Sequence, residues 1–349
     1  MQWRLQRACC AFIVLLASAG QLGAQEPGTA ETVEKVTNLD AMVISATDAG
    51  PHIWEYRRGD QKVLVLGTVY PVPTGLDFVP ATLQKSIDAS SVVIGSPGVV
   101  VGEGIGLFRG LTLWSSVRRS KYLPEGRTLS DVLPPGDYQR WTELKARYLP
   151  GNRDVERMLP MYAAWQLYEA VLERSDLEQK TVSAVETVMR LARDKRIPVI
   201  DAKFHLVIRD PKRAVAEFAV DAEADQRCLR ATMDGIESLP GLSQQLARDW
   251  SDGSVEGMRA TLDADTLPTP CWSWLTNEAI ARQQGEDLDR AVRGSWIRAV
   301  QEAAGANRIV FTTAPVTDVL RGTGRIAWLL GLGFVPVTEA SPLPTPTRD

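Results

Sequence analysis

Residues 63–70 read Val-Leu-Val-Leu-Gly-Thr-Val-Tyr, and near the other end of the chain residues 308–315 read Arg-Ile-Val-Phe-Thr-Thr-Ala-Pro. Each run is apolar, rich in β-branched residues, and ends abruptly in small or hydroxyl-bearing residues, which is typical of a buried strand that opens into a loop. Loops that follow the strands of an open α/β sheet are where ligands and catalytic side chains usually lie. We therefore expect the functional site where these two strands end.

Further short strands are expected around these two runs, at Ile53–Arg57, Val92–Ile94, Ile197–Ile200 and Phe334–Val337. Helical spacing of apolar residues dominates the middle of the chain. It includes one helix from Pro211 through Cys228, a stretch at Leu242–Leu262 and one long amphipathic helix at Glu278–Ala304. The sequence therefore predicts an α/β fold, with one mixed β-sheet built from both ends of the chain, surrounding helices and a helical insertion at about residues 130–305.

Composition sets the broad class of the protein. The chain has 349 residues, of which 44% are hydrophobic and 23% charged, so a folded core is expected and global disorder is not. Its formal net charge is −4 and it contains no long basic run, which argues against a nucleic-acid partner. We expect a single α/β domain at residues 51–340 and a loose tail at 341–349.

The N-terminus has the features of a signal peptide. Arg4 and Arg7 precede an apolar stretch at residues 8–19 that is too short to span a bilayer comfortably, and small residues follow it. We expect a signal peptide at residues 1–24, a linker at 25–50, and a periplasmic or secreted bacterial protein without a stable membrane span after cleavage. The alternative is an uncleaved membrane anchor.

Cysteine usage agrees with export. Cys9 and Cys10 belong to the expected signal peptide, so Cys228 and Cys271 remain in the mature chain. Two cysteines in an oxidising compartment predict a disulfide, although two buried free thiols remain the alternative. The chain has no Cys-x-x-Cys motif, which argues against a structural zinc site or a thioredoxin-type motif.

The order of elements resembles one known family. A hairpin follows Trp54, one strand ends in Gly67-Thr68, a second strand follows a short helix, and after a helical middle the chain closes with Gly333 and a last strand. This order resembles the TraB/GumN family, whose relatives include the TIKI metalloproteases, over nearly the whole expected domain. The resemblance implies a mixed sheet with two similar halves. It also implies a metal-dependent hydrolytic site made by two histidines and a glutamate.

The residues at those family positions differ in this chain. Gly67 and Thr68 match the first motif, but Tyr70 stands where the resemblance implies the first histidine. Gly95 replaces the glutamate, and Pro315 replaces the second histidine. In addition, Thr312 occupies a glycine position, and Arg293 is a candidate for one member of an Arg-Asn pair without a clean match.

The chemical consequence of these differences is direct. A hydrolytic metal site normally needs about three His, Glu, Asp or Cys ligands and one open position. Pro315 and Gly95 carry no side-chain donor, and Tyr70 would ligate only as a phenolate. We therefore expect no bound metal, no cofactor and no metal-dependent catalysis.

We expect an exported, catalytically inactive family member that acts as a binding or interaction protein of the cell envelope. Its partner would be an envelope protein, a peptide or a glycan. One alternative is a hydrolase with relocated residues, for which Asp201, Asp318, Tyr70 and Arg293 are the polar candidates. A Ser96–His205 pair is a weaker version of that alternative. A structural envelope protein without a small ligand is the other.

Overall fold

The structure is a computed structural model that describes residues 50–76, 80–101, 118–178, 184–216, 218, 221–264, 271–305 and 308–337. The expected signal peptide, nearly all of the linker and the tail lie outside these ranges. Within the ranges, no helix is long and apolar enough to cross a membrane.

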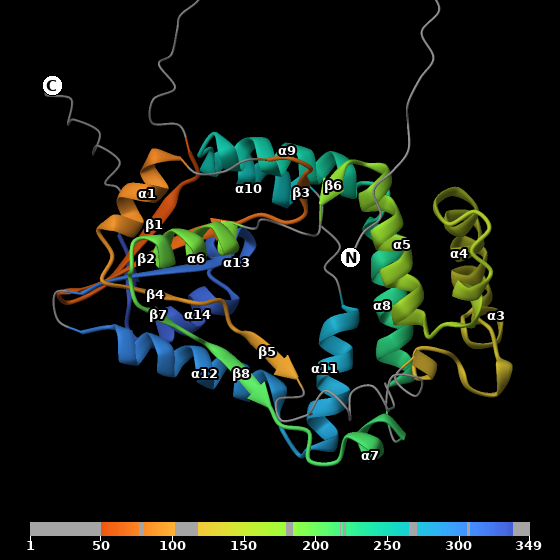
Figure 1. The fold of residues 1–349 in the computed structure, drawn as a ribbon. Helices are drawn as coiled ribbons and strands as arrows, with labels where there is room; N and C mark the ends of the chain where they lie inside the picture. Colours follow the sequence, from red (N-terminus) through yellow and green to blue (C-terminus); the bar gives the residue numbers. More distant parts are fainter. Residues whose placement is uncertain are drawn as a thin grey trace, which may run out of the picture. The chain divides into compact units, whose positions relative to one another are not determined.

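The fold contains a six-stranded mixed sheet, which lies in the left half of Figure 1. Its strands, in spatial order, are β10 (Val335–Pro336), β1 (Ile53–Arg58), β2 (Gln61–Thr68), β9 (Ile309–Pro315), β4 (Val92–Ile94) and β7 (Val199–Ile200). The strands β2, β9, β4 and β7 run parallel, whereas β1 is antiparallel to both of its neighbours. The predicted mixed sheet from both ends of the chain is therefore confirmed.

Strand register brings the two deciding runs side by side. Along β2 and β9, Lys62 pairs with Ile309 and Thr68 pairs with Pro315. On the other side of β9, Val93 pairs with Phe311. Because these strands are parallel, the ends of β2, β9 and β4 lie at one edge of the sheet, which we call the C-terminal edge.

Side chains of the central strands alternate between two hydrophobic cores, as the two-residue period of a strand requires. Val63 and Val65 point into a core with α12 (Leu288–Ala303) and α14 (Gly324–Gly331). Leu66 and Phe311 point into the opposite core. The helices that cover this second face are α1 (Ala81–Asp88), α6 (Ala184–Asp194), α9 (Leu239–Ser251) and α10 (Val255–Ala264). The sheet is thus covered by helices on both faces.

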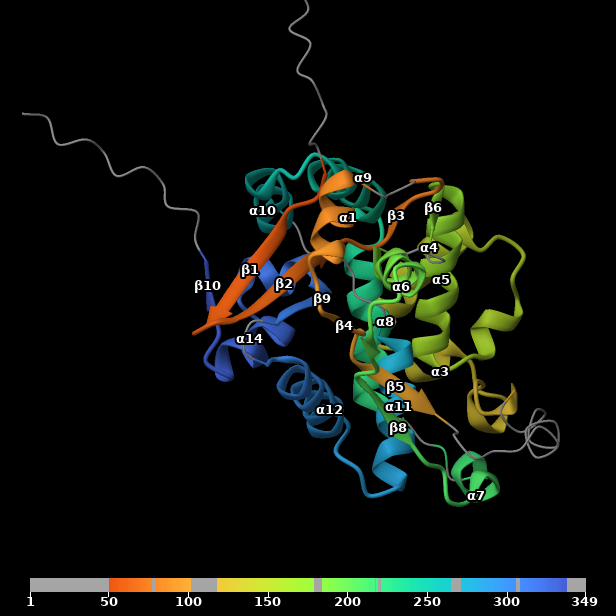
Figure 2. The same ribbon diagram turned by 60° about the vertical axis from the view of Figure 1, so that its left-hand side comes forward.

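A separate helical core contains α3 (Leu129–Val132), α4 (Pro135–Tyr148), α5 (Pro160–Arg174) and α8 (Ala222–Gly235), with α11 (Trp272–Gln283) packed against it. Figure 2 shows α5, α8 and α11 together. Cys228 of α8 and Cys271 before α11 lie at disulfide distance, with their Cα atoms 5.8 Å apart. A covalent bond between them would tie α11 to this core.

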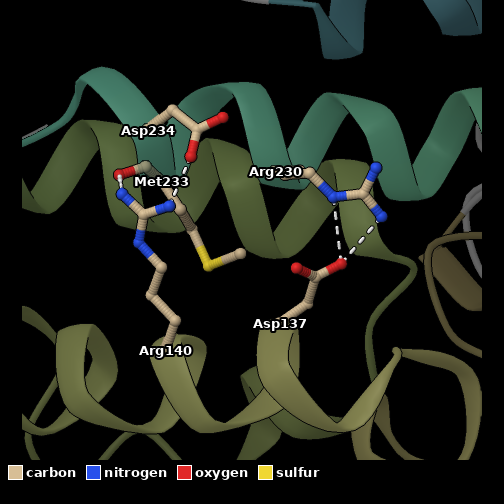
Figure 3. Close-up of polar contacts among 5 residues, drawn as sticks. All are labelled: Asp137, Arg140, Arg230, Met233 and Asp234. Atoms are coloured by element: carbon tan, nitrogen blue, oxygen red, sulfur yellow. Dashed lines mark hydrogen bonds and ion pairs between the residues drawn. The ribbon is translucent and has the colours of Figure 1, made fainter.

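Two ion pairs join α4 to α8 (Figure 3). The arginine comes from α8 in one pair and from α4 in the other. Arg230 of α8 donates from Nε and Nη2 to one carboxylate oxygen of Asp137, at 3.0 and 2.8 Å. Arg140 of α4 contacts Asp234 in return, and also donates to the carbonyl of Met233 at 2.9 Å. These pairs connect the two helices at their partly exposed faces.

Three helices that the sequence predicted as continuous are interrupted. The helix that starts at Pro211 ends at Ala216, and α8 begins anew with Asp221 as its N-cap. The stretch Leu242–Leu262 is divided between α9 and α10. The long helix at Glu278–Ala304 is divided between α11 and α12, because Gly285 has φ +76° and the Asp287 carboxylate accepts from the N–H of Arg290. Left-handed glycine and an acidic N-cap are ordinary helix boundaries that apolar spacing does not reveal.

Two small sheets were not predicted. The strands β5 (Gly98–Val101) and β8 (Lys203–Leu206) pair in parallel, directly after β4 and β7. The strands β3 (Val72–Pro73) and β6 (Leu177–Glu178) pair in antiparallel fashion. A short helix, α13 (Val316–Arg321), follows β9, and α7 (Pro211–Ala216) follows β8. The β5–β8 pair continues the chain beyond the C-terminal edge.

Candidate functional site

Gly67 is required by close packing at the end of β2. A Cβ atom at this position would lie 2.6 Å from the ring of Trp54, which is closer than side chains pack. The carbonyl of Gly67 accepts a hydrogen bond from the indole N–H of Trp250 at 2.7 Å. Next to it, the hydroxyl of Thr68 donates to the carbonyl of Ala314 at 3.2 Å and joins β2 to β9. The Gly-Thr pair therefore has a structural role at the C-terminal edge.

Hydroxyl groups form a second connection, between β9 and the end of β4. Thr312 is buried and donates to the carbonyl of Ile94 at 3.3 Å. The neighbouring Thr313 is also buried, and its hydroxyl lies 2.9 Å from that of Ser96. These hydroxyls take part in hydrogen bonds within the protein, at the edge where the sequence predicts the site.

A hollow with a volume of about 820 Å³ lies at this edge. We call it the strand-edge hollow. It is lined by Gly95, Ser96, Val185, Glu186, Met189, Arg190, Arg193, Val199, Asp201 and Lys203. Gly95 forms part of its wall, and a Cβ there would lie 3.1 Å from the terminal methyl group of Met189. A larger residue at this position therefore requires the flexible end of Met189 to move.

Asp201 is the acidic candidate in the strand-edge hollow, and its carboxylate already has local partners. One oxygen accepts from the backbone N–H of Lys203 at 3.1 Å, and the other lies 3.4 Å from Nε2 of His205. His205 is therefore placed beside Asp201, while the recorded partner of the Ser96 hydroxyl is Thr313.

Pro315 and Asp318 line a second hollow of about 330 Å³. The Asp318 carboxylate accepts from the backbone N–H of Arg325 at 3.0 Å, near the start of α14. The guanidinium of Arg325 donates to the carbonyl of Thr313 at 2.9 Å and so holds the end of β9. Burial lowers the pKa of Arg325 to about 10, while the negative charge of Asp318 opposes this shift. Asp318 and Asp201 line different hollows, and no recorded contact among the described residues joins their side chains.

Arg293 lines a third hollow, of about 580 Å³, along α12. The ring of Trp328 borders both this hollow and the one at Pro315. Arg293 is therefore near the C-terminal edge, although it does not share a hollow with Gly95.

Tyr70 lies beside α5. The hydroxyl of Tyr168 on that helix interacts with the Tyr70 hydroxyl, which by itself lowers the Tyr70 pKa. Burial and the negative charge of Glu169 outweigh this effect and raise the pKa of Tyr70 to about 12. The phenolate form, the only form that would bind a metal, is thus strongly disfavoured.

The donor set at the C-terminal edge does not fit a transition metal. Gly95 and Pro315 offer no side-chain donor, and the phenol of Tyr70 is held neutral. Over the part of the chain that the structure describes, no three His, Cys, Asp or Glu side chains gather closely enough to hold an ion. Gly95 and Pro315 line separate hollows. A single cleft shared by Tyr70, Gly95 and Pro315 therefore stays a prediction.

Sequence reasoning missed two residues that organise this edge, Trp250 and Arg325. Both act on backbone carbonyls, of Gly67 and Thr313 respectively. Trp250 is separated from its partner by 183 positions and lies within an ordinary amphipathic helix. No local signal in the sequence distinguishes it from a core tryptophan. Arg325 was detectable in principle, as a charged residue inside the apolar run of α14.

Comparison with known protein families identifies a family. A sequence model described as the TraB/PrgY/gumN family matches residues 52–302. No curated protein and no solved structure matches the chain. The match includes the ends of β2 and β4 and stops before β9.

Proposed function

We propose, from the premise that this chain belongs to the TraB/PrgY/gumN family, that it is an exported and catalytically inactive member of that family. In this proposal the protein acts as a binding or interaction protein of the bacterial cell envelope. The proposal rests on the identity of the side chains at the ends of β2, β4 and β9. Tyr70, Gly95 and Pro315 stand there in place of the metal-binding and acid-base residues that the resemblance implies.

The remaining polar groups at the C-terminal edge support inactivity. The hydroxyls of Ser96 and Thr313 hydrogen-bond each other, and the hydroxyl of Thr68 is bonded to a backbone carbonyl. A nucleophilic serine would need a general base within hydrogen-bond reach, and the recorded partner of Ser96 is another hydroxyl. None of these groups has the arrangement of an activated nucleophile.

The hollows at the same edge support binding. Ligand sites in proteins usually occupy about 300–1,000 Å³ and combine apolar walls with a few polar groups. The strand-edge hollow, of about 820 Å³, has apolar walls at Met189 and Val199 and charged groups from α6 and β8. With glycine at position 95, no side chain from that position enters the hollow.

Restoration of the missing side chains tests the proposal. The triple variant Tyr70→His, Gly95→Glu and Pro315→His should gain zinc or manganese affinity, measured by isothermal titration calorimetry. Each single variant should gain almost none, because one ligand does not hold the ion. In the Gly95→Glu variants the flexible end of Met189 must move, so Met189→Ala is added to the triple variant and, as a control, to the otherwise unchanged protein.

Two outcomes would contradict this account. If the unmodified protein binds metal as tightly as the triple variant and cleaves peptides, the family chemistry has been relocated rather than lost, and the hydrolase alternative is correct. If a folded triple variant binds no metal, the assignment of Tyr70, Gly95 and Pro315 to the family positions is wrong. Circular dichroism and thermal unfolding establish that each variant is folded.

A further inference from the structure

Three cationic side chains surround the strand-edge hollow. Arg190 and Arg193 come from α6, and Lys203 comes from β8. The two arginines share one face of the helix with Glu186 and Met189, since residues three and four positions apart lie on the same side. The hollow is thus bordered by positive charge from two separate elements.

None of these three cations has an ion-pair partner recorded among the described residues. Lys195, only two residues beyond Arg193, contrasts with them, because it contacts the carboxylate of Asp88 on α1. The positive charge of Lys195, at the end of α6 near α1, is therefore neutralised by an ion pair. No ion pair is recorded among the described residues for the two arginines that line the hollow.

The acidic groups in the same hollow do not neutralise this charge. Asp201 accepts from the backbone of Lys203 and lies beside His205, so both of its oxygens are in use. With Glu186 the hollow has two carboxylates against three cations. Gly95, where the family resemblance implies a glutamate, supplies neither a third negative charge nor a side chain to fill the space.

We propose that the strand-edge hollow binds a small ligand that carries at least two phosphate or carboxylate groups. This inference rests on the proposed function, since it assigns a ligand class to the site that replaced the family chemistry. Arginine presents a planar fork of donors that matches the oxygens of both groups, and such charge-assisted hydrogen bonds are among the stronger ones in proteins. Cations from these two elements would contact separate anionic groups of one ligand.

The test is a calorimetric titration of the purified protein, freed of metal by dialysis against chelator and then against buffer. Inorganic pyrophosphate and citrate serve as the phosphate and carboxylate probes. We expect saturable binding of at least one probe, with an affinity that falls as salt rises. The variant Arg190→Gln/Arg193→Gln should weaken binding at least tenfold. Gly95→Glu, which adds a negative charge to the hollow, should also weaken it.

A matched control removes the same amount of charge elsewhere. Arg127→Gln/Arg153→Gln changes two exposed arginines that do not line the hollow, and it should alter the affinity less than twofold. Equal loss in both double variants would mean unspecific attraction and would overturn the proposal. So would the absence of binding for both probes, which would leave the inactive-family proposal intact. Binding that appears only before metal removal would contradict both.

Discussion

Asp225 is a buried carboxyl group between α8 and the start of α5. Its side chain is 4% exposed, and it accepts a hydrogen bond from the backbone N–H of Met161. Burial raises the pKa of Asp225 from 3.8 to about 7, although the Met161 hydrogen bond opposes the shift. Because the folded-state pKa is raised, the native state binds this proton more tightly than the unfolded state. The contribution to stability is therefore lost as pH rises from about 4 to about 7.

The variant Asp225→Asn should show this linkage directly. Asparagine keeps the acceptor for Met161 and cannot ionise, so its stability relative to the unmodified protein should grow by a few kcal/mol between pH 5 and pH 8. Urea denaturation at both pH values measures the difference. Asp252→Asn, which removes the carboxylate of an exposed residue, is the control. An advantage for Asp225→Asn that does not change with pH would contradict the raised pKa.

Gly67 is tightly packed against Trp54 at the end of β2. Gly67→Ala places a methyl group 2.6 Å from the Trp54 ring and should destabilise the fold by about 1–3 kcal/mol, the usual cost of overpacking a core. Gly136→Ala in α4 is the matched control, because a Cβ there meets no atom within 4 Å. Thermal unfolding compares the two variants. If both behave alike, the contact with Trp54 does not explain this glycine.

The expected disulfide would join two secondary-structure elements, α8 and the start of α11. Cys228 and Cys271 are 43 positions apart, and closing a loop of that length stabilises by about 4 kcal/mol on the chain-entropy model. Thiol titration of the unfolded and unreduced mature protein should find no free thiol. The variant Cys228→Ala/Cys271→Ala should unfold at a lower temperature, with reduced native protein as the control. Two titratable thiols would show that the bond is absent.

Helices and strands differed in how well the sequence predicted them. The strands around Val63 and Val310 were found because buried, β-branched runs between turn residues have few other interpretations. Helix boundaries failed at Gly285, where apolar spacing continues in phase on both sides of a break. The parallel β5–β8 pair was missed because its strands are short and their pairing depends on residues about 105 positions apart, such as Gly98 and Lys203.

The candidate site was likewise only partly predictable from the sequence. Its position at the strand ends follows from the sequence, because parallel strands end at one edge. Its interior does not, because Trp250, Arg325 and the cations of α6 reach it through tertiary packing. That Tyr70, Gly95 and Pro315 replace the family's site residues stays a prediction from the sequence, and the sequence could not show which hollow each position would line.

At the scale of the whole molecule, export is the prediction that determines the compartment. The residues concerned lie outside the described ranges, so the expectation rests on Arg4, Arg7 and the short apolar stretch after them. Expression in a Gram-negative host, with N-terminal sequencing of the product, should give a mature chain that begins between Gln21 and Glu26. A matched variant, Arg4→Glu/Arg7→Glu, should slow processing. An intact Met1 on protein in the inner-membrane fraction would indicate an uncleaved anchor instead.

The central claim is that this family member has lost its metal chemistry, and elemental analysis tests it most directly. Protein purified without chelator is analysed for zinc, manganese and cobalt, and is assayed in parallel for peptide cleavage with and without chelator. The account predicts metal far below one equivalent per chain and no chelator-sensitive cleavage, because Gly95, Pro315 and the neutral phenol of Tyr70 provide no ligand set. One equivalent of metal together with cleavage that chelator abolishes would contradict it.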